Sequence, residues 1–248
     1  MKAVLEGFAA EVLAEHGVRA TPMIDVDRLA RRLRVEVREQ RLDPGDYGHT
    51  TVRSGTVCVT LRASMPRGRR RFVLAHELGH VLIADPRSQA MQIRAEMRVD
   101  EERFCDRFAE ALLLPAGWLR NRYGRSAQSL PALLECAKAA GVSPAAASIA
   151  LVRAAGWDRT LLRLHSTGGR WQLLSVTGHL PAAPSAVHST LELARALDAL
   201  VDDDVPLRAV VVEVGGVLMT VPAQAAIRGN VALLLVDFQS RRKGVHRS

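Results

Sequence analysis

Cysteine is scarce in this sequence, and the cysteines that are present do not form pairs. Only three occur in 248 residues, scattered as Cys58, Cys105 and Cys136 with no C-x-x-C spacing. An odd, scattered set does not build the disulfide framework that stabilises small secreted domains. The cysteine content therefore favours a reducing compartment, and we expect a cytoplasmic protein.

Long apolar runs are also missing. The most apolar stretch, residues 209–221, is about thirteen residues long and is interrupted by Glu213 and two glycines, whereas a membrane-spanning helix needs about 20 apolar residues. Glu6 and Glu11 interrupt the first apolar stretch, and the apolar region of an export signal does not tolerate such charges. The sequence therefore predicts neither a membrane span nor an export signal.

The composition is that of a folded protein. Apolar residues make up 48% and charged residues 24% of the chain, a balance that excludes a disordered protein. A chain of this length buries a core without metal or disulfide support, so we expect any metal to serve chemistry. The formal net charge is +8. The densest basic run, Arg67, Arg69, Arg70 and Arg71, is interpreted as a solvated approach to a helix, with attraction of acidic partners, nucleic acid included, as the alternative.

Apolar periodicity and turn residues predict an α+β fold. Helices are expected at residues 4–16, 24–33, 70–83, 99–114, 130–140, 144–155 and 189–200, with a polar connection between the third and the fourth. Strands are expected at residues 35–37, 51–53, 56–61, 161–165, 171–176, 209–214, 217–221 and 231–238. The second and third strands flank a Ser-Gly turn and predict a hairpin.

One of these helices carries a motif associated with metal chemistry. Residues 76–80 read His-Glu-Leu-Gly-His. Histidines four residues apart lie on one helix face, so both imidazoles can reach one ion, and Glu77 is placed beside the open position of that ion. The surrounding helix is apolar, and burying these groups is costly unless they are paired or bind metal. The motif predicts metal ligation by His76 and His80, and Gly79 marks close approach of another backbone.

The next predicted helix supplies carboxylates. Glu102 and Asp106 are one turn apart and follow His80 after 21 intervening residues, which is room for a turn and a helix packing back. A carboxylate ligand followed four residues later by a carboxylate that orients a ligand histidine is a coherent pair. Glu101, however, points nearer the centre of the apolar face of this helix. The residues alone therefore leave both Glu101 and Glu102 as candidates for the third ligand.

Both segments resemble blocks of the ImmA/IrrE metallopeptidases. Residues 71–80, RFVLAHELGH, are similar to the family block R-x-F-x-x-A-H-E-L-G-H. The arginine of the block stands two residues before the phenylalanine, so the match allows a shift of one residue within the run of arginines. Residues 102–115 are similar to the second block, E-x-x-A-N/D-x-F-A-x-x-L-L-x-P, with Cys105 in place of the usual alanine. The resemblance implies a zincin-like fold, Zn(2+) as cofactor, Glu102 as third ligand in a thermolysin-like order, and Asp106 as the partner of His76.

The resemblance also implies an activity. We predict an intracellular zinc endopeptidase in which Glu77 is the general base, performing limited proteolysis of a regulatory partner. The expected substrate is a helix-turn-helix DNA-binding repressor in stress response or mobile-element control. The alternative is a non-proteolytic antirepressor or DNA-associated regulatory protein on the same scaffold.

Three parts are expected along the chain. Residues 1–125 are expected to form a zincin-like metallopeptidase domain with a small β-hairpin or sheet, and residues 126–156 a helix-turn-helix-like pair. Residues 157–248 are expected to form a C-terminal α/β module with a sensory or docking role. The alternative for this module is a structural brace that completes the peptidase core. The second helix of the pair offers only Ser148 and Arg153 as polar side chains. Base readout needs several such residues on one face, so direct DNA binding is not favoured.

Three smaller assignments stay open at this stage. Tyr123 and His49 are candidates for stabilising an oxyanion. The strand Thr56–Leu61 either borders the cleft, where an extended substrate can pair with it, or is a core strand of the hairpin. Cys105 is interpreted as small buried packing, with a redox or inhibitory role as the alternative.

Overall fold

The computed structural model describes residues 2–19, 23–167, 170–178, 186–188, 210–214, 217–228 and 231–238. Within these residues the fold is α+β, which confirms the predicted fold class. The chain divides into two compact units, described in turn below: Met1–Leu119 with Cys136–Ala146, and Arg120–Glu135 with Ala147–Ser248. The boundaries expected after residues 125 and 156 stay predictions.

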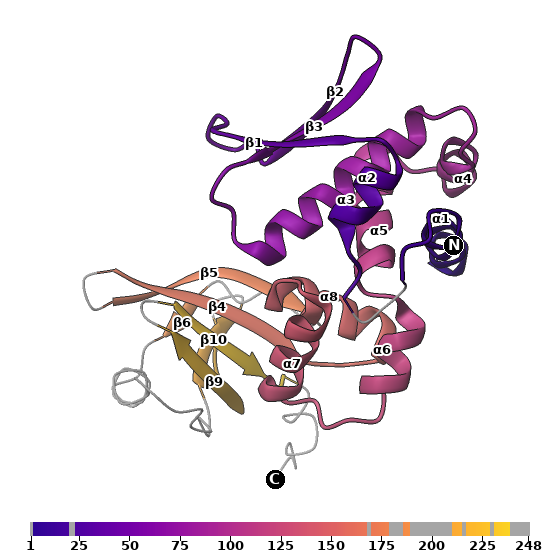
Figure 1. Ribbon diagram of the computed structural model, residues 1–248. Helices are drawn as coiled ribbons and strands as arrows, with labels where there is room; N and C mark the ends of the chain where they lie inside the picture. Colours follow the sequence, from indigo (N-terminus) through magenta and orange to yellow (C-terminus); the bar gives the residue numbers. More distant parts are fainter. Residues whose placement is uncertain are drawn as a thin grey trace. The chain divides into compact units, whose positions relative to one another are not determined.

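A small three-stranded sheet forms one layer of the first unit (Figure 1). Its strands are β1 (Glu36–Gln40), β2 (Gly48–Arg53) and β3 (Thr56–Arg62), in the order β1-β3-β2. β3 is parallel to β1 and antiparallel to β2. Ser54 and Gly55, both with positive φ, form the turn between β2 and β3, which confirms the predicted hairpin. β3 is therefore the central strand, so Thr56–Leu61 is a core strand, and β2 lies at the edge of this sheet.

The helices of the first unit are organised around α3. They are α1 (Lys2–Glu15), α2 (Val26–Arg32), α3 (Arg67–Ala84), α4 (Ala90–Met97) and α5 (Glu101–Leu113). α3 contacts β2 and β3 on one side and α5 on the other (Figure 1). α1 packs on α5, where the ring of Phe8 lies 6.4 Å from that of Phe104 and 5.7 Å from that of Phe108. α3, which carries the His-Glu-Leu-Gly-His motif, is thus the central helix of this unit.

The close backbone approach predicted at Gly79 is confirmed. A Cβ atom at Gly79 would lie 2.9 Å from the Sγ atom and 3.1 Å from the Cα atom of Cys105. Real Cβ contacts are rarely this short, so only glycine lets α5 pack this tightly against α3. Cys105 is fully buried at this crossing, which supports its interpretation as small buried packing.

Asp100 fixes the beginning of α5. Its carboxylate accepts a hydrogen bond from the backbone N–H of Arg103, 2.7 Å away, as an N-cap residue does. Glu101 and Glu102 consequently occupy the first helical turn, where the helix dipole favours negative charge. The helix expected over 99–114 therefore begins two residues later than the periodicity suggests, and its first turn presents two adjacent carboxylates.

Two short helices were not predicted. Where we expected a polar connection, residues 90–97 form α4, with Ala90, Ile93 and Met97 buried. The polar residues between these three positions mask the helical period over so short a segment. α6 (Ala116–Tyr123) likewise has no sequence signal beyond the preceding proline. α7 (Leu130–Ala140) and α8 (Pro144–Ala155) have the predicted bounds.

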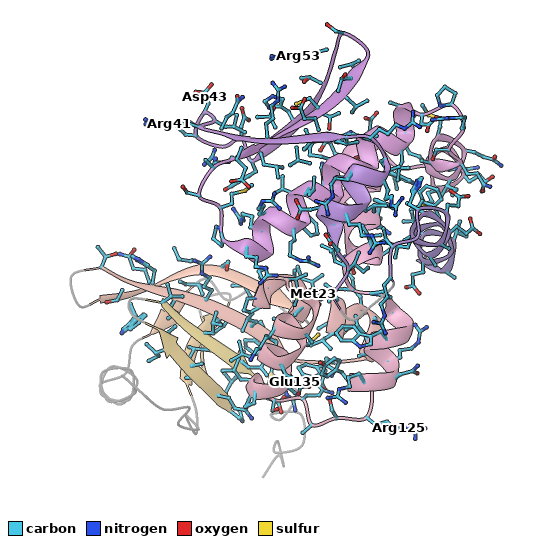
Figure 2. All side chains as sticks on the ribbon, viewed as in Figure 1. Met23, Arg41, Asp43, Arg53, Arg125 and Glu135 are labelled. Atoms are coloured by element: carbon cyan, nitrogen blue, oxygen red, sulfur yellow. The ribbon has the colours of Figure 1, made fainter. Side chains whose placement is uncertain are left out.

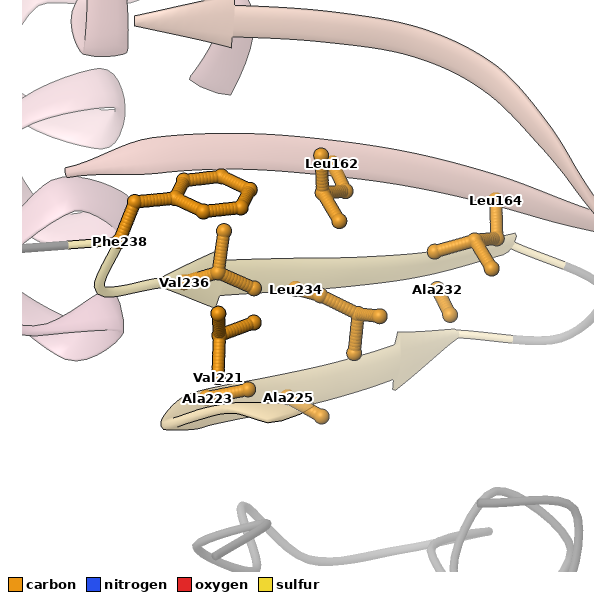
Figure 3. Packing of buried hydrophobic residues seen from close by; sticks show 9 residues of the cluster. All are labelled: Leu162, Leu164, Val221, Ala223, Ala225, Ala232, Leu234, Val236 and Phe238. Atoms are coloured by element: carbon orange, nitrogen blue, oxygen red, sulfur yellow. The ribbon is translucent and has the colours of Figure 1, made fainter. Parts of the chain in front are cut away.

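A four-stranded antiparallel sheet forms the core of the second unit. Its strands are β4 (Thr160–Thr167), β5 (Arg170–Gly178), β9 (Ala223–Arg228) and β10 (Val231–Val236), in the order β5-β4-β10-β9. Apolar side chains from β4, β9 and β10 pack together, with Phe238 beside them (Figure 3). The sequence of β9, AQAAIR, lacks the β-branched alternation typical of strands, which is why it was not predicted.

A second sheet of this unit has the order β6-β7-β8, formed by Ala186–His188, Val210–Val214 and Val217–Val221. β7 and β8 agree with the predicted strands, whereas β6 was not predicted. The helix expected at residues 189–200 lies outside the described residues. Within the described part of the chain, no helix has the length and apolarity to cross a membrane.

Candidate metal centre

Three side chains from α3 and α5 converge on one point. The Nε2 atoms of His76 and His80 lie 3.2 Å apart. The carboxylate of Glu102 reaches both, with its oxygens 3.2 Å from Nε2 of His76 and 3.4 Å from Nε2 of His80. All three potential ligand atoms lie within 4.8 Å of one another, so this group could hold a metal ion. Two imidazoles and one carboxylate are a donor set typical of zinc sites with an open position.

Each imidazole has a second carboxylate on its other nitrogen. Nδ1 of His76 is 2.9 Å from Asp106, and Nδ1 of His80 is 2.7 Å from Glu101. With the proton on Nδ1, each ring donates to its carboxylate and turns the Nε2 lone pair toward the common point. Glu101, the other candidate for the third ligand, thus contacts the side of His80 that faces away from this point. Arg94 of α4 lies 3.9 Å from the second oxygen of Glu101.

The electrostatic surroundings favour positive charge at this centre. Burial alone would lower the pKa of His76, but the hydrogen bond and charge of Asp106, together with two further carboxylates, outweigh it, so the pKa is raised. Burial raises the pKa of the Cys105 thiol, and the negative charges of Glu101, Glu102, Glu77 and Asp106 raise it further. The thiol consequently stays protonated, which does not support a redox or ligand role for Cys105.

Glu77 lies beside the three converging side chains and is only 5% exposed. Its Oε2 atom accepts a hydrogen bond from the hydroxyl of Thr50, 2.8 Å away on β2. β2 lies close against α3 here, since a Cβ atom at Gly48 would be 2.8 Å from Cγ1 of Val73. Sequence reasoning missed Thr50, because nothing in the pattern of the hairpin relates this threonine to the motif.

An open cleft of about 770 Å³ lies between β2 and α3 and extends to the first turn of α5. Its lining includes the residues of the converging group, Glu77, and successive residues of β2. Of the two oxyanion candidates, His49 lines this cleft. Tyr123 does not: it is buried in the second unit, where its carbonyl accepts a hydrogen bond from the indole of Trp157.

Comparisons with known proteins place this geometry in context. Residues 30–152 match the family model of Peptidase M78, described as the IrrE N-terminal-like domain. Among solved structures, a Mycobacterium tuberculosis transcriptional regulator is similar with a TM-score of 0.52 and 16% identity, covering 98% of this chain and 78% of that chain. At that identity the likeness concerns the fold alone. No match was found among curated proteins.

Proposed function

Because residues 30–152 belong to the IrrE N-terminal-like domain family of M78 peptidases, we propose that this protein is a zinc-dependent endopeptidase that cleaves a regulatory protein partner. The observation that carries the proposal is the convergence of His76, His80 and Glu102 within 4.8 Å, next to the buried carboxylate of Glu77.

The donor chemistry fits zinc. Imidazole nitrogen and carboxylate oxygen are common zinc ligands, and three protein ligands leave one coordination position open, as catalytic sites require. When bound, the ion supplies Lewis acidity that polarises the scissile carbonyl. We assign the ligand role to His76, His80 and Glu102. Asp106 and Glu101 hold the two imidazoles in the orientation and tautomer that ligation needs.

Glu77 is the proposed general base. Its carboxylate takes the proton from the attacking water and passes it to the leaving amine. Thr50 occupies one oxygen of that carboxylate at 2.8 Å, which fixes the plane of the group and leaves the other oxygen as the acceptor. His49 stays the candidate oxyanion stabiliser because it lines the same cleft.

The edge strand β2 supports a polypeptide substrate. β2 pairs only with β3 among the described strands, so its outer backbone groups can pair with an extended peptide. Residues 48–52 line the cleft that also contains Glu77 and the ligand group. A peptide added to this edge would therefore lie along the metal centre.

The partner proposed as substrate is a helix-turn-helix DNA-binding repressor, in stress response or mobile-element control in the cytoplasm. The fold neighbour is itself described as a transcriptional regulator, and extending that role to this chain is part of the proposal. The C-terminal module is proposed to have a sensory or docking role that restrains cleavage until a signal arrives.

Metal analysis and co-expression test this function. Wild-type protein should contain about one zinc per chain, and His80→Ala should lose most of it. Glu77→Gln should keep the metal but no longer cleave a co-expressed repressor. Unchanged zinc in His80→Ala would disprove the ligand assignment. Derepression by Glu77→Gln with the repressor intact would favour the non-proteolytic alternative instead.

A further inference from the structure

One end of the cleft is aromatic and cationic, unlike the carboxylate-rich metal centre. Tyr47, which precedes β2, and Arg69, in the first turn of α3, both line it. The guanidinium carbon of Arg69 lies 4.5 Å from the centre of the Tyr47 ring, and that of Arg62 lies 4.9 Å from it. Two cations are thus held over one ring, and Tyr47 is 41% exposed.

Arg69 differs from its neighbours in the basic run. Arg70 is committed to the fold, because it pairs with Asp27 at 2.9 Å and with Glu39 at 2.6 Å. Arg71 is buried, with only 6% of its surface exposed. Arg69 is exposed, and within the described residues its side chain has neither a hydrogen bond nor an ion pair. It is the member of the run that is both in the cleft and available.

The stacked geometry leaves the guanidinium ready for a carboxylate. A guanidinium that lies on an aromatic ring uses its face for that contact, while its N–H donors point outward in its own plane. Those donors match the two oxygens of a carboxylate in parallel hydrogen bonds. Asp46 also lines this end of the cleft, but it forms no ion pair with Arg69 among the described residues.

The position of Arg69 relative to the metal centre corresponds to a substrate subsite. Arg69 and His76 both line the cleft from α3, seven residues or about 10 Å apart along the helix axis. β2 runs alongside, with Gly48 close to Val73 and Thr50 hydrogen-bonded to Glu77. An extended peptide advances about 3.3 Å per residue. A substrate side chain that reaches Arg69 is therefore on a residue about three positions from the scissile bond.

We propose that Tyr47 and Arg69 select substrates that carry an acidic side chain about three residues from the cleaved bond. Arg69 donates two hydrogen bonds to the substrate carboxylate, the ring holds the guanidinium in place, and Arg62 adds positive charge nearby. This inference rests on the proposed peptidase function, because it describes a specificity site of the same cleft.

Binding rather than cleavage tests the inference. The probe is a set of fluorescein-labelled decapeptide pools with amidated C-termini, in which one position is fixed as Glu or as Gln. The protein is the zinc-loaded full chain carrying Glu77→Gln, and binding is measured by fluorescence anisotropy. Each peptide position is fixed in turn. At one of these positions we expect the Glu pool to bind about fivefold more tightly than the Gln pool, which is the gain in affinity from one charge-assisted hydrogen bond at an exposed site.

Variants in the same background separate the subsite from net charge. Arg69→Gln should abolish the Glu preference. Arg69→Glu should reverse it, so that a third pool with Lys at the same position binds more tightly than the Glu pool. Tyr47→Ala should weaken the preference, because the ring that holds the guanidinium is lost. Arg53→Gln is the matched control: Arg53 is exposed at the tip of the β2–β3 hairpin (Figure 2) and does not line the cleft. Its loss removes the same charge and should leave the preference intact.

Equal binding of Glu and Gln pools, or no measurable binding of either, would overturn the inference. So would a preference that survives Arg69→Gln or disappears in Arg53→Gln. These outcomes can be distinguished from a failure of the proposed function. If wild type cleaves peptides without regard to acidic residues, the peptidase assignment stands and the subsite does not. If binding depends on Arg69 but wild type cleaves nothing, Arg69 still binds acidic peptides in the cleft, whereas the peptidase assignment and a role of Arg69 in substrate cleavage both fall.

Discussion

At the scale of single residues, two adjacent carboxylates of α5 contact different sides of the imidazoles, and we propose different roles for them on that ground. Glu102 approaches the Nε2 atoms of His76 and His80, whereas Glu101 contacts Nδ1 of His80. Neighbouring positions of a helix project about 100° apart, which lets one helical turn supply both the proposed ligand and the proposed orienting group. Asp106, one turn later, completes the pattern on His76.

The first prediction concerns these orienting carboxylates. Asp106→Asn and Glu101→Gln should each weaken zinc affinity by about 10- to 100-fold, because a neutral amide holds the imidazole tautomer less firmly. Competition with a chromogenic chelator measures the affinity. Glu96→Gln is the control, since Glu96 is exposed on α4 and, within the described residues, its side chain hydrogen-bonds only with Gln92. An affinity that stays at the wild-type value in both variants would contradict the orienting role.

A second prediction at this scale concerns Thr50. Thr50→Val removes the hydroxyl that donates to Glu77 while keeping the side-chain shape, so kcat for partner cleavage should fall roughly tenfold, the value of one hydrogen bond to a charged group. Zinc content and KM should be unchanged, and Thr50→Ser should restore most of the rate. Equal kcat in Thr50→Val and wild type would show that Glu77 needs no such support.

At the scale of elements, the site depends on how closely α5 approaches α3. His76 and His80 come from one helix and Glu102 from the other, so a small displacement between the helices separates these proposed ligands. Gly79 sets their distance, because a Cβ atom there would lie 3.1 Å from the backbone Cα of Cys105. Backbone atoms do not move aside as the end of a flexible side chain does.

Gly79→Ala should therefore weaken both folding and metal binding. We expect the overpacking to cost about 1–3 kcal/mol, partly offset by about 1 kcal/mol from better helix propensity, with a lower zinc affinity as α5 is displaced. Denaturant unfolding and chelator competition measure the two effects. Gly7→Ala is the control, since Gly7 lies in α1 with nothing within 4 Å of an added Cβ, and it should stabilise the protein. The argument fails if Gly79→Ala stabilises the protein to the same extent.

At the scale of the whole molecule, neither compact unit is a single continuous stretch of the chain. Residues 120–135 and 147–155 belong to the same unit as the C-terminal strands. The side chain of Gln224 accepts a hydrogen bond from the backbone N–H of Leu130, and Trp157 donates one to Tyr123. The second unit is therefore built from helical segments that precede the sheet as well as from the sheet.

This arrangement yields a prediction for truncation. A chain ending at Gly156 removes the strands of the second unit and should leave Leu130, Leu133 and Leu151, all buried in the full chain, in contact with water. We expect it to bind a hydrophobic dye and to aggregate, as measured by dye fluorescence and light scattering. A soluble, cooperatively folding truncated chain would contradict this structural dependence, and unregulated cleavage by such a chain would add support to the proposed sensory role.

How much the sequence predicts depends on how local the signal is. The helices with strong periodicity and the Ser-Gly hairpin were predicted because each pattern lies within a dozen residues. α4, α6 and β9 were not, because short segments such as AQAAIR are compatible with several structures until a neighbour pairs with them. The helix expected at residues 189–200 is outside the described residues.

The sequence by itself indicated the family, through two blocks that resemble it, and it placed His76, Glu77 and His80 close together, because spacing along one helix fixes which side chains share a face. Only the tertiary structure distinguished Glu101 from Glu102 in position, brought Thr50 to Glu77, and placed Arg69 with Tyr47 at the end of the cleft. Each of these depends on the distance between elements far apart in the chain. That distance is set by packing, at positions such as Gly79 and Gly48. A glycine within a helix can mark a close approach, as predicted at Gly79, but it does not show which distant segment packs there.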